Sequence, residues 1–246
     1  MIGTKNLVMK SIKQFAFKLL LFSFLIFSGI AKAQSTKLEV RFAGGPNRSS
    51  LYGNKAIDSS NPLYGITGDL SLEYHFNRFV SILPGISYNE KGNINPTVYT
   101  DTLGNPLATA DIKTKLKYLN VPLLIRFTFG NRFKFYFNTG PYLGLLQNAK
   151  TITPSIGSIE ATEFNIDSTL KEQEWGVSLG LGIAFPITKR LNLGLELRND
   201  AGLQNISDLT INNNGKIKTN ETSALFSISY ILIKSKDKDK DKEKDD

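Results

Sequence analysis

The sequence predicts an all-β protein: an eight-stranded antiparallel up-and-down transmembrane β-barrel. Apolar and polar residues alternate along runs of ten or more residues, and the connections between runs alternate between long and short. Alternation with a period of two is typical of a β-strand. After the N-terminal leader no stretch of 18 uninterrupted apolar residues occurs, so the length needed for a membrane helix is not reached. A closed barrel is the other structure that pairs all of its backbone groups inside a bilayer.

The first 33 residues read as a secretory signal peptide. A lysine-rich start leads into the apolar run Leu19–Ile30, and Ala-Lys-Ala at 31–33 is typical of a cleavage site before Gln34. About a dozen apolar residues are too few to span a bilayer. The predicted organisation is a signal peptide at 1–33, an outer-membrane barrel domain at 34–233 and a disordered charged tail at 234–246, which holds six lysines and six acids.

Charge and composition exclude several classes of function. The formal charge of +8 falls to 8 − 5 = +3 once the five lysines of the leader are removed, so nucleic-acid binding is not indicated. The chain has no cysteine, and His75 is its only histidine. We therefore expect no disulfide, no metal cluster and no cofactor.

Alternation defines each predicted strand in turn. The runs Lys37–Gly45 and Gly65–Phe76 place an apolar residue at every second position, and Phe79–Lys91 does the same around Pro84 and Gly85, which suggest a bulge. The next two strands lie in Leu116–Leu146, on either side of the turn Gly130–Arg132. The last three are Glu174–Ile187, Leu191–Arg198 and Thr222–Ile233. Opposite its apolar face, Glu174–Ile187 carries only small residues from Gly176 to Ala184.

The connections between these strands sort by length. Three are short turns, at Asn77-Arg78, Gly130–Arg132 and Thr188–Arg190. Four are predicted long loops: Pro46–Tyr64, Gly92–Ile112, Asn148–Gln173 and Asn205–Lys218. Outer-membrane barrels have short periplasmic turns and longer extracellular loops. The pattern predicts both mature termini in the periplasm.

We predict that the apolar face meets lipid and the polar face lines the lumen. A narrow eight-stranded barrel has room for side chains inside, not for an aqueous channel. The predicted lumenal polar network comprises Glu73, His75, Arg126, Glu196 and Arg198. The predicted aromatic girdle near the short turns comprises Phe76, Phe79, Phe129, Phe133 and Phe185.

No catalytic site is predicted. Ser71, Glu73 and His75 lie side by side on one predicted strand face, but such a row does not make a triad without an oxyanion hole. His75 is instead expected to be a lumenal hydrogen-bond partner, and no phosphate-binding loop or nucleophile motif is present.

Four runs of the sequence resemble the PorT-like family of outer-membrane β-barrel proteins: YLNVPLLIRF at 118–127, FYFNTGPYLGLL at 135–146, LPGISYNEKG at 83–92 and GLGIAFPI at 180–187. The resemblance covers nearly all of Lys37–Ile233. It implies an outer-membrane barrel of about eight strands and, by analogy with PorT, a link to type nine protein secretion and gliding. The chain departs from such barrels in ending on charged residues beyond Tyr230 and Leu232, where an aromatic terminus often serves assembly.

The leading functional expectation is a non-enzymatic barrel with a structural, adhesive or secretion-accessory role. Its expected partners are outer-membrane lipid and proteins that contact the extracellular loops or the charged tail. Two alternatives remain open: a barrel enzyme acting on outer-leaflet lipid, and a soluble periplasmic barrel whose apolar face surrounds a ligand.

Overall fold

A computed structural model describes residues 37–100, 102–131, 133–155, 160–209 and 215–233. The predicted signal peptide and charged tail lie outside these ranges. Nine strands form one antiparallel sheet: β1 (Lys37–Tyr52), β2 (Asn61–His75), β3 (Val80–Thr100), β4 (Pro106–Phe129), β5 (Lys134–Thr153), β6 (Thr162–Asn165), β7 (Gln173–Pro186), β8 (Leu191–Gly202) and β9 (Lys218–Ile233). Two short helical segments, α2 (Lys55–Asp58) and η2 (Asp167–Thr169), lie in the connections.

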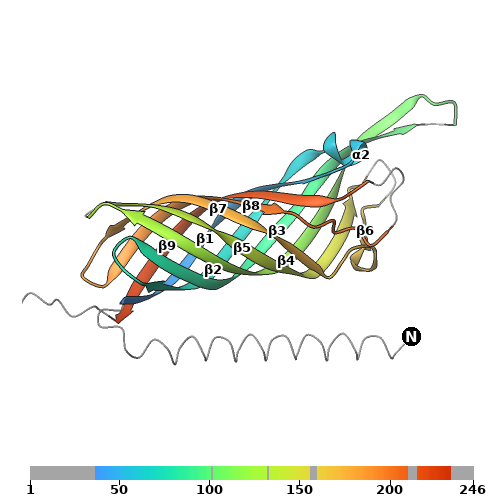
Figure 1. Cartoon of the computed structure of the whole chain (residues 1–246). Coiled ribbons are helices and arrows are strands. Elements are labelled where there is room, and N and C mark those ends of the chain that lie inside the picture. The colour runs from blue at the N-terminus through green and yellow to red at the C-terminus, as the bar shows by residue number, and fades with distance from the viewer. Residues whose placement is uncertain (1–36, 101, 132, 156–159, 210–214, 234–246) are drawn as a thin grey trace, which may run out of the picture. The chain divides into compact units, whose positions relative to one another are not determined.

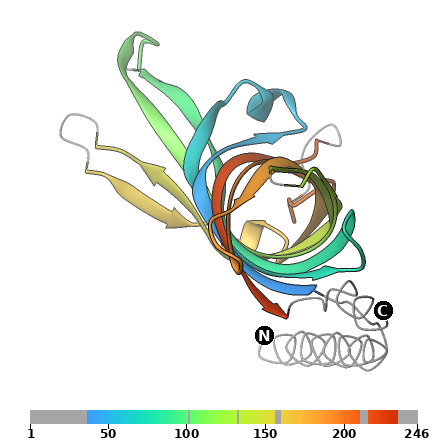
Figure 2. The ribbon, with the colours of Figure 1, turned by 90° about the vertical axis from the view of Figure 1, so that its left-hand side faces the viewer.

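Eight of the strands close into a ring. Each pairs with its neighbour along the chain, β5 pairs with β7, and β1 pairs with β9, where Val40 lies opposite Tyr230. The short β6 pairs only with residues 150–153 at the end of β5 and is not part of the ring. Figure 2 shows the ring nearly end-on. The predicted eight-stranded up-and-down barrel is confirmed.

The three short connections share one end of the barrel, on the left in Figure 1. Each spans four residues: 76–79 between β2 and β3, 130–133 between β4 and β5, and 187–190 between β7 and β8. Gly130 makes the second turn with a φ of 93°, a left-handed conformation that glycine adopts without steric cost. We call this side the short-turn end and the opposite side the long-loop end.

The strands continue further than the sequence predicts at the long-loop end. Most of the predicted loop Gly92–Ile112 is strand, because β3 and β4 stay paired in one register up to Tyr99 and Ala108 and pair once more at Thr100 and Pro106. This hairpin projects beyond the ring in Figure 1. The predicted loops Pro46–Tyr64 and Asn148–Gln173 are likewise shortened by strand residues at their ends. Asn, Gly and Pro have low strand propensity, but pairing with a neighbouring strand overrides that preference.

Side chains alternate between the two faces of the barrel wall, as predicted. Large apolar residues point outward along every barrel strand, among them Phe42, Leu70, Leu123, Leu181 and Phe226, which are 37–65% exposed. Polar and charged residues fill the inward positions. An apolar exterior around a polar interior is the arrangement of a membrane barrel. It contradicts the soluble alternative, whose apolar face would have pointed inward.

Candidate functional site

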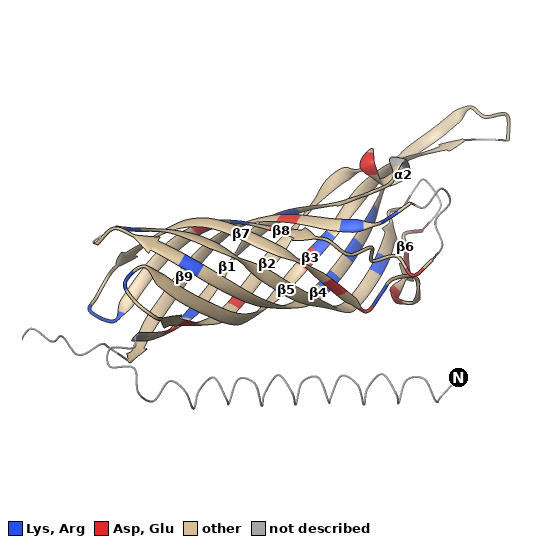
Figure 3. Ribbon diagram, in the orientation of Figure 1, with Lys and Arg blue, Asp and Glu red and all other residues tan. Residues whose placement is uncertain are grey.

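Charged side chains of both signs line the inside of the barrel. Figure 3 shows acidic and basic positions along the barrel strands as well as at their ends. Eleven charged residues on inward positions are each at most 7% exposed: Glu39, Arg41, Asp69, Glu73, Lys91, Arg126, Glu174, Glu196, Arg198, Asp200 and Glu221. Burying a charge is costly unless it is paired and hydrogen-bonded. The pairings therefore determine what this interior can do.

A closed square of ion pairs occupies the middle of the lumen. Arg41 contacts Asp69 at 3.1 Å and Glu196 at 2.8 Å. Arg198 contacts the same two residues, with its Nη1 3.1 Å from Asp69 Oδ2 and its Nε 2.8 Å from Glu196 Oε1. Each arginine thus neutralises both carboxylates. The square joins β1, β2 and β8 across the barrel.

Arg126 on β4 connects this square to Glu73 on β2. Its Nη1 lies 2.5 Å from Glu73 Oε2, and its Nη2 lies 3.7 Å from Glu196 Oε2. Its Nε donates to Asn138 Oδ1 at 2.8 Å, and the guanidinium stacks 4.0 Å from the ring centroid of Tyr136. We call the six joined residues the central network: Arg41, Asp69, Glu73, Arg126, Glu196 and Arg198. It contains three carboxylates and three guanidiniums.

At the short-turn end, His75 bridges two glutamates. Glu39 and Glu73 lie directly opposite one another on β1 and β2. The Nε2 of His75 is 3.1 Å from Glu39 Oε1 and 3.5 Å from Glu73 Oε1. The outer oxygen of Glu39, Oε2, accepts hydrogen bonds from Asn192 and Ser229, each at 3.0 Å.

A second charged cluster surrounds Lys91, nearer the long-loop end. Its ammonium lies 3.3 Å from Glu174 Oε1 and donates to Thr219 Oγ1, also at 3.3 Å. The rings of Tyr118 and Tyr142 flank it with centroids 5.0 and 4.9 Å away. Cation–π contacts of this kind strengthen as the cation loses water, and Lys91 is fully buried.

Glu221 is the hub of a third set of polar contacts, between the other two. Its Oε1 accepts hydrogen bonds from Asn47 at 3.0 Å, Thr67 at 2.6 Å, Asn89 at 2.8 Å and Ser223 at 2.8 Å. Donors from β1, β2, β3 and β9 therefore converge on one carboxylate oxygen. Together with the other two clusters, these side chains fill the lumen over the length that they span.

Apolar side chains lie in the lumen at the long-loop end. Leu51, Leu116, Tyr118, Ala149 and Ile206 form one buried cluster, each at most 6% exposed. Ile206 comes from the connection between β8 and β9, whose backbone is fixed by its N–H donating to the Ile217 carbonyl at 2.8 Å. The barrel is thus polar within and carries an apolar cluster at this end.

The small residues on the inward face of β7 make room for two tyrosines of β5. A Cβ added at Gly176 would lie 2.6 Å from ring atoms of Tyr142, and one added at Gly182 would lie 2.3 Å from the ring of Tyr136. The two tyrosine hydroxyls then reach Glu174 at 2.7 Å and Glu196 at 3.2 Å. The glycines of β7 therefore allow Tyr142 to reach the cluster around Lys91 and Tyr136 to reach the central network.

The structure brings together all five residues of the predicted lumenal network. Glu73 contacts Arg126 and His75, Arg126 approaches Glu196, and Glu196 contacts Arg198. Sequence reasoning missed Lys91, Glu174 and Glu221, because it placed them at strand ends or in loops. The signal was available in their parity: each lies two residues from another inward position, Asn89, Gly176 and Ser223 respectively.

The five predicted girdle phenylalanines all lie within or beside the short turns. Phe76, Phe79, Phe129 and Phe133 are 45–58% exposed, and Phe185 is half-buried. Arg78 covers the ring of Phe79, with its guanidinium carbon 4.4 Å from the ring centroid.

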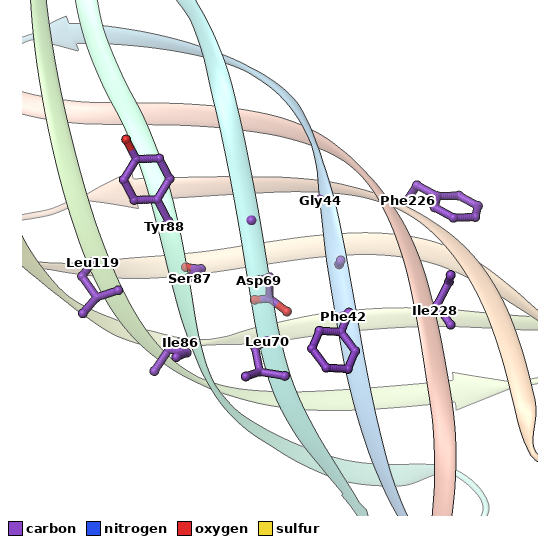
Figure 4. Close-up of a pocket in the computed structure, with 12 residues that line it drawn as sticks. Phe42, Gly44, Asp69, Leu70, Ile86, Ser87, Tyr88, Leu119, Phe226 and Ile228 are labelled. Atoms are coloured by element: carbon purple, nitrogen blue, oxygen red, sulfur yellow. The ribbon is translucent and has the colours of Figure 1, made fainter.

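The lipid-facing wall is hollowed where two glycines meet. Gly44 on β1 lies opposite Gly68 on β2, and the missing side chains leave an open depression of about 650 Å³. Phe42, Leu70 and Phe226 border it in Figure 4. Its apolar border and its place on the outer wall make it part of the lipid-contacting surface.

Ser71, Glu73 and His75 do not form a hydrolytic site in the structure. The hydroxyl of Ser71 donates to Asp69 Oδ1 at 3.1 Å, while His75 is engaged by the two glutamates. His75 Nε2 therefore contacts carboxylates and not a serine nucleophile. What the lumenal arrangement provides is a rigid, charge-paired interior.

These features define a membrane barrel with a filled lumen. A comparison of the sequence with family models identifies the same class of barrel. The model described as "Outer membrane protein beta-barrel domain" matches residues 32–208. The chain belongs to this family, and it is a bacterial outer-membrane β-barrel protein. No curated protein matches its sequence. Within the described residues, no helix is both long and apolar enough to cross a membrane.

Several solved outer-membrane proteins are similar to this chain. A major outer membrane protein from Thermus thermophilus is 12% identical, with a TM-score of 0.49 over 80% of this chain and 99% of that chain. Ail, the attachment invasion locus protein of Yersinia pestis, is 13% identical, with a TM-score of 0.39 over 80% and 99%. The outer membrane protease OmpT from Escherichia coli is 7% identical, with a TM-score of 0.43 over 82% and 99%.

Proposed function

We propose that this protein is a non-enzymatic outer-membrane barrel that presents its long-loop end to protein partners, in a structural, adhesive or secretion-accessory role of the PorT-like kind. The observation that carries the proposal is the projecting β3–β4 hairpin, whose paired register continues to Tyr99 and Ala108 (Figure 1). A rigid paired hairpin costs less conformational entropy on binding than a loop that must be ordered.

The surface of this hairpin supports a protein partner. Val98 is 56% exposed and Leu107 is 69% exposed, and both belong to the β3–β4 hairpin. Large apolar side chains gathered outside the lipid-facing wall are typical of an interaction site. In this account the short turns and both mature termini face the periplasm, and the long-loop end faces outward.

The filled lumen favours this role over transport. Three charge-paired or hydrogen-bonded clusters occupy its length, so a diffusing solute would have to displace buried ion pairs. A role on outer-leaflet lipid is supported less well, because His75 lies at the short-turn end and contacts carboxylates.

The test is to shorten the hairpin while leaving the barrel intact. Residues 98–109 are replaced by a two-residue Asn-Gly turn, which favours a tight hairpin and joins the paired residues Thr97 and Ala110, in cells that carry no other copy of the gene. Loss of secretion, gliding or surface adhesion with normal barrel levels supports the proposal. A control variant keeps the hairpin and carries Arg190→Ala at the short-turn end, where the side chain donates to the Tyr230 hydroxyl, and it should behave as the wild type. Wild-type behaviour in all three assays after shortening contradicts a partner role for this hairpin.

A further inference from the structure

We propose that Glu39, Glu73 and His75 form a binding site for one divalent transition-metal ion, of the zinc class, at the short-turn end of the lumen. These side chains offer three ligand atoms that lie within 4.8 Å of one another. The composition had suggested no metal site because His75 is the only histidine. One imidazole with two carboxylates is nevertheless a ligand set that such ions accept.

The distances match the spacing of ligands around a single ion. Zinc lies about 2.0–2.2 Å from nitrogen and oxygen ligands, so two ligands of a tetrahedral site are about 3.3 Å apart. The Nε2 of His75 is 3.1 Å from Glu39 Oε1 and 3.5 Å from Glu73 Oε1. The imidazole nitrogen is thus at ligand spacing from both carboxylate oxygens. Three protein ligands leave a fourth position for water.

The strand register explains why a cation is favoured at this point. Glu39 and Glu73 are directly opposite residues of β1 and β2, and like charges at such positions repel. A divalent ion bound between the two carboxylates relieves this repulsion.

Outer contacts hold the carboxylates in a ligating orientation. Asn192 and Ser229 both donate to Glu39 Oε2, each at 3.0 Å, and Arg126 contacts Glu73 Oε2 at 2.5 Å. The outer oxygens are therefore tethered, while the Oε1 atoms turn toward the imidazole, and that of Glu73 also accepts a hydrogen bond from the Ser81 hydroxyl at 2.6 Å. Hydrogen bonds to the second oxygen of a ligating carboxylate are the usual support of a metal site. His75 is 17% exposed, which leaves an approach from the short-turn end.

The single histidine makes the test direct. The protein is produced from the full chain, extracted from membranes in detergent without a histidine tag, and labelled with nitrogen-15 only in histidine. We expect one set of imidazole signals, and added Zn²⁺ should move the Nε2 signal to the position of a metal-bound nitrogen with Nδ1 still protonated. Calorimetry should give one ion per chain. Glu39→Gln should weaken binding by about tenfold or more.

Two controls separate this site from other zinc binding. Glu163→Gln removes an exposed carboxylate at the long-loop end and should leave the affinity unchanged. His75→Gln should abolish the calorimetric signal. An imidazole spectrum that stays unchanged in a large excess of Zn²⁺ overturns the proposal. Binding that survives His75→Gln also overturns it.

Discussion

Glu73 and Arg126 meet 2.5 Å apart inside the barrel, although they belong to strands that are not neighbours. β3 separates β2 from β4 in the sheet, and the small Ser81 of β3 stands between them, donating to Glu73 Oε1 at 2.6 Å. The pair therefore spans three strands. The lumenal side chains therefore form a network that links strands of the wall, and they are not independent polar residues.

Removing Arg126 should destabilise the barrel strongly. Arg126→Ala leaves Glu73 buried without its guanidinium partner, and breaking a buried pair costs about 3–5 kcal/mol. The measurement is urea unfolding in lipid vesicles, followed by tryptophan fluorescence from Trp175, the only tryptophan of the chain.

Lys150→Ala is the matched control for Arg126→Ala. It breaks the exposed pair with Glu163, whose side chains are 44% and 56% exposed, and such pairs contribute about 0–1 kcal/mol. Equal effects of the two variants would show that the lumenal pair is as solvated as the surface pair.

Lys91 and Glu174 should show strong energetic coupling. Lys91→Met leaves the Glu174 carboxylate without its cation in a fully buried setting, which should cost about 3–5 kcal/mol. The double variant Lys91→Met with Glu174→Gln removes both charges and should recover much of that loss. A double-mutant cycle measures the coupling, and simple additivity of the two single effects would refute the pairing.

The inward face of β7 should not tolerate a methyl group at Gly182. Gly182→Ala places a Cβ 2.3 Å from the Tyr136 ring, and overpacking typically costs about 1–3 kcal/mol. The same vesicle unfolding assay measures the effect. Gly68→Ala is its control, because a Cβ at Gly68 has no atom within 4 Å. A neutral Gly182→Ala would mean that Tyr136 does not occupy the space over β7.

A charge on the outer wall should be costly at mid-strand. Leu181 points outward from β7 and is 65% exposed, so Leu181→Arg places a guanidinium in lipid, at about 2–4 kcal/mol near the bilayer midplane. Leu107→Arg, on the projecting hairpin, should change the free energy of unfolding little. Similar values for the two variants would place Leu181 in water.

The sequence predicted which side chains face lipid and which face the lumen better than it predicted which lumenal side chains meet. Alternation assigns an inward or outward direction to each residue, so Arg126, Glu196 and Leu181 were placed on the correct faces. Which lumenal groups meet depends on the stagger between strands that are distant in sequence, as for Arg41 on β1 and Glu196 on β8. That stagger is not encoded in a local pattern.

The ends of the strands could not be predicted from local sequence patterns either. Lys91 and Glu221 lie where apolar alternation fades, and turn-forming residues such as Asn93 and Gly92 pointed to a loop. The pairing of β3 with β4 carries the strands onward, with Gly92 allowing an approach in which a Cβ would lie 1.9 Å from the Thr114 carbonyl oxygen. Partner strands, not propensity, decide such positions.

The most direct test of the central claim, an apolar wall in lipid around a filled polar lumen, is site-directed spin labelling along β4. The chain has no cysteine, so single cysteines can be introduced at 121–127 without removing any other. In lipid vesicles the account predicts high collision rates with oxygen at Leu123, Ile125 and Phe127 and low rates with both oxygen and a water-soluble nickel complex at Leu124 and Arg126. Uniform rates along the strand, or high nickel accessibility at Leu123 and Ile125, would contradict it.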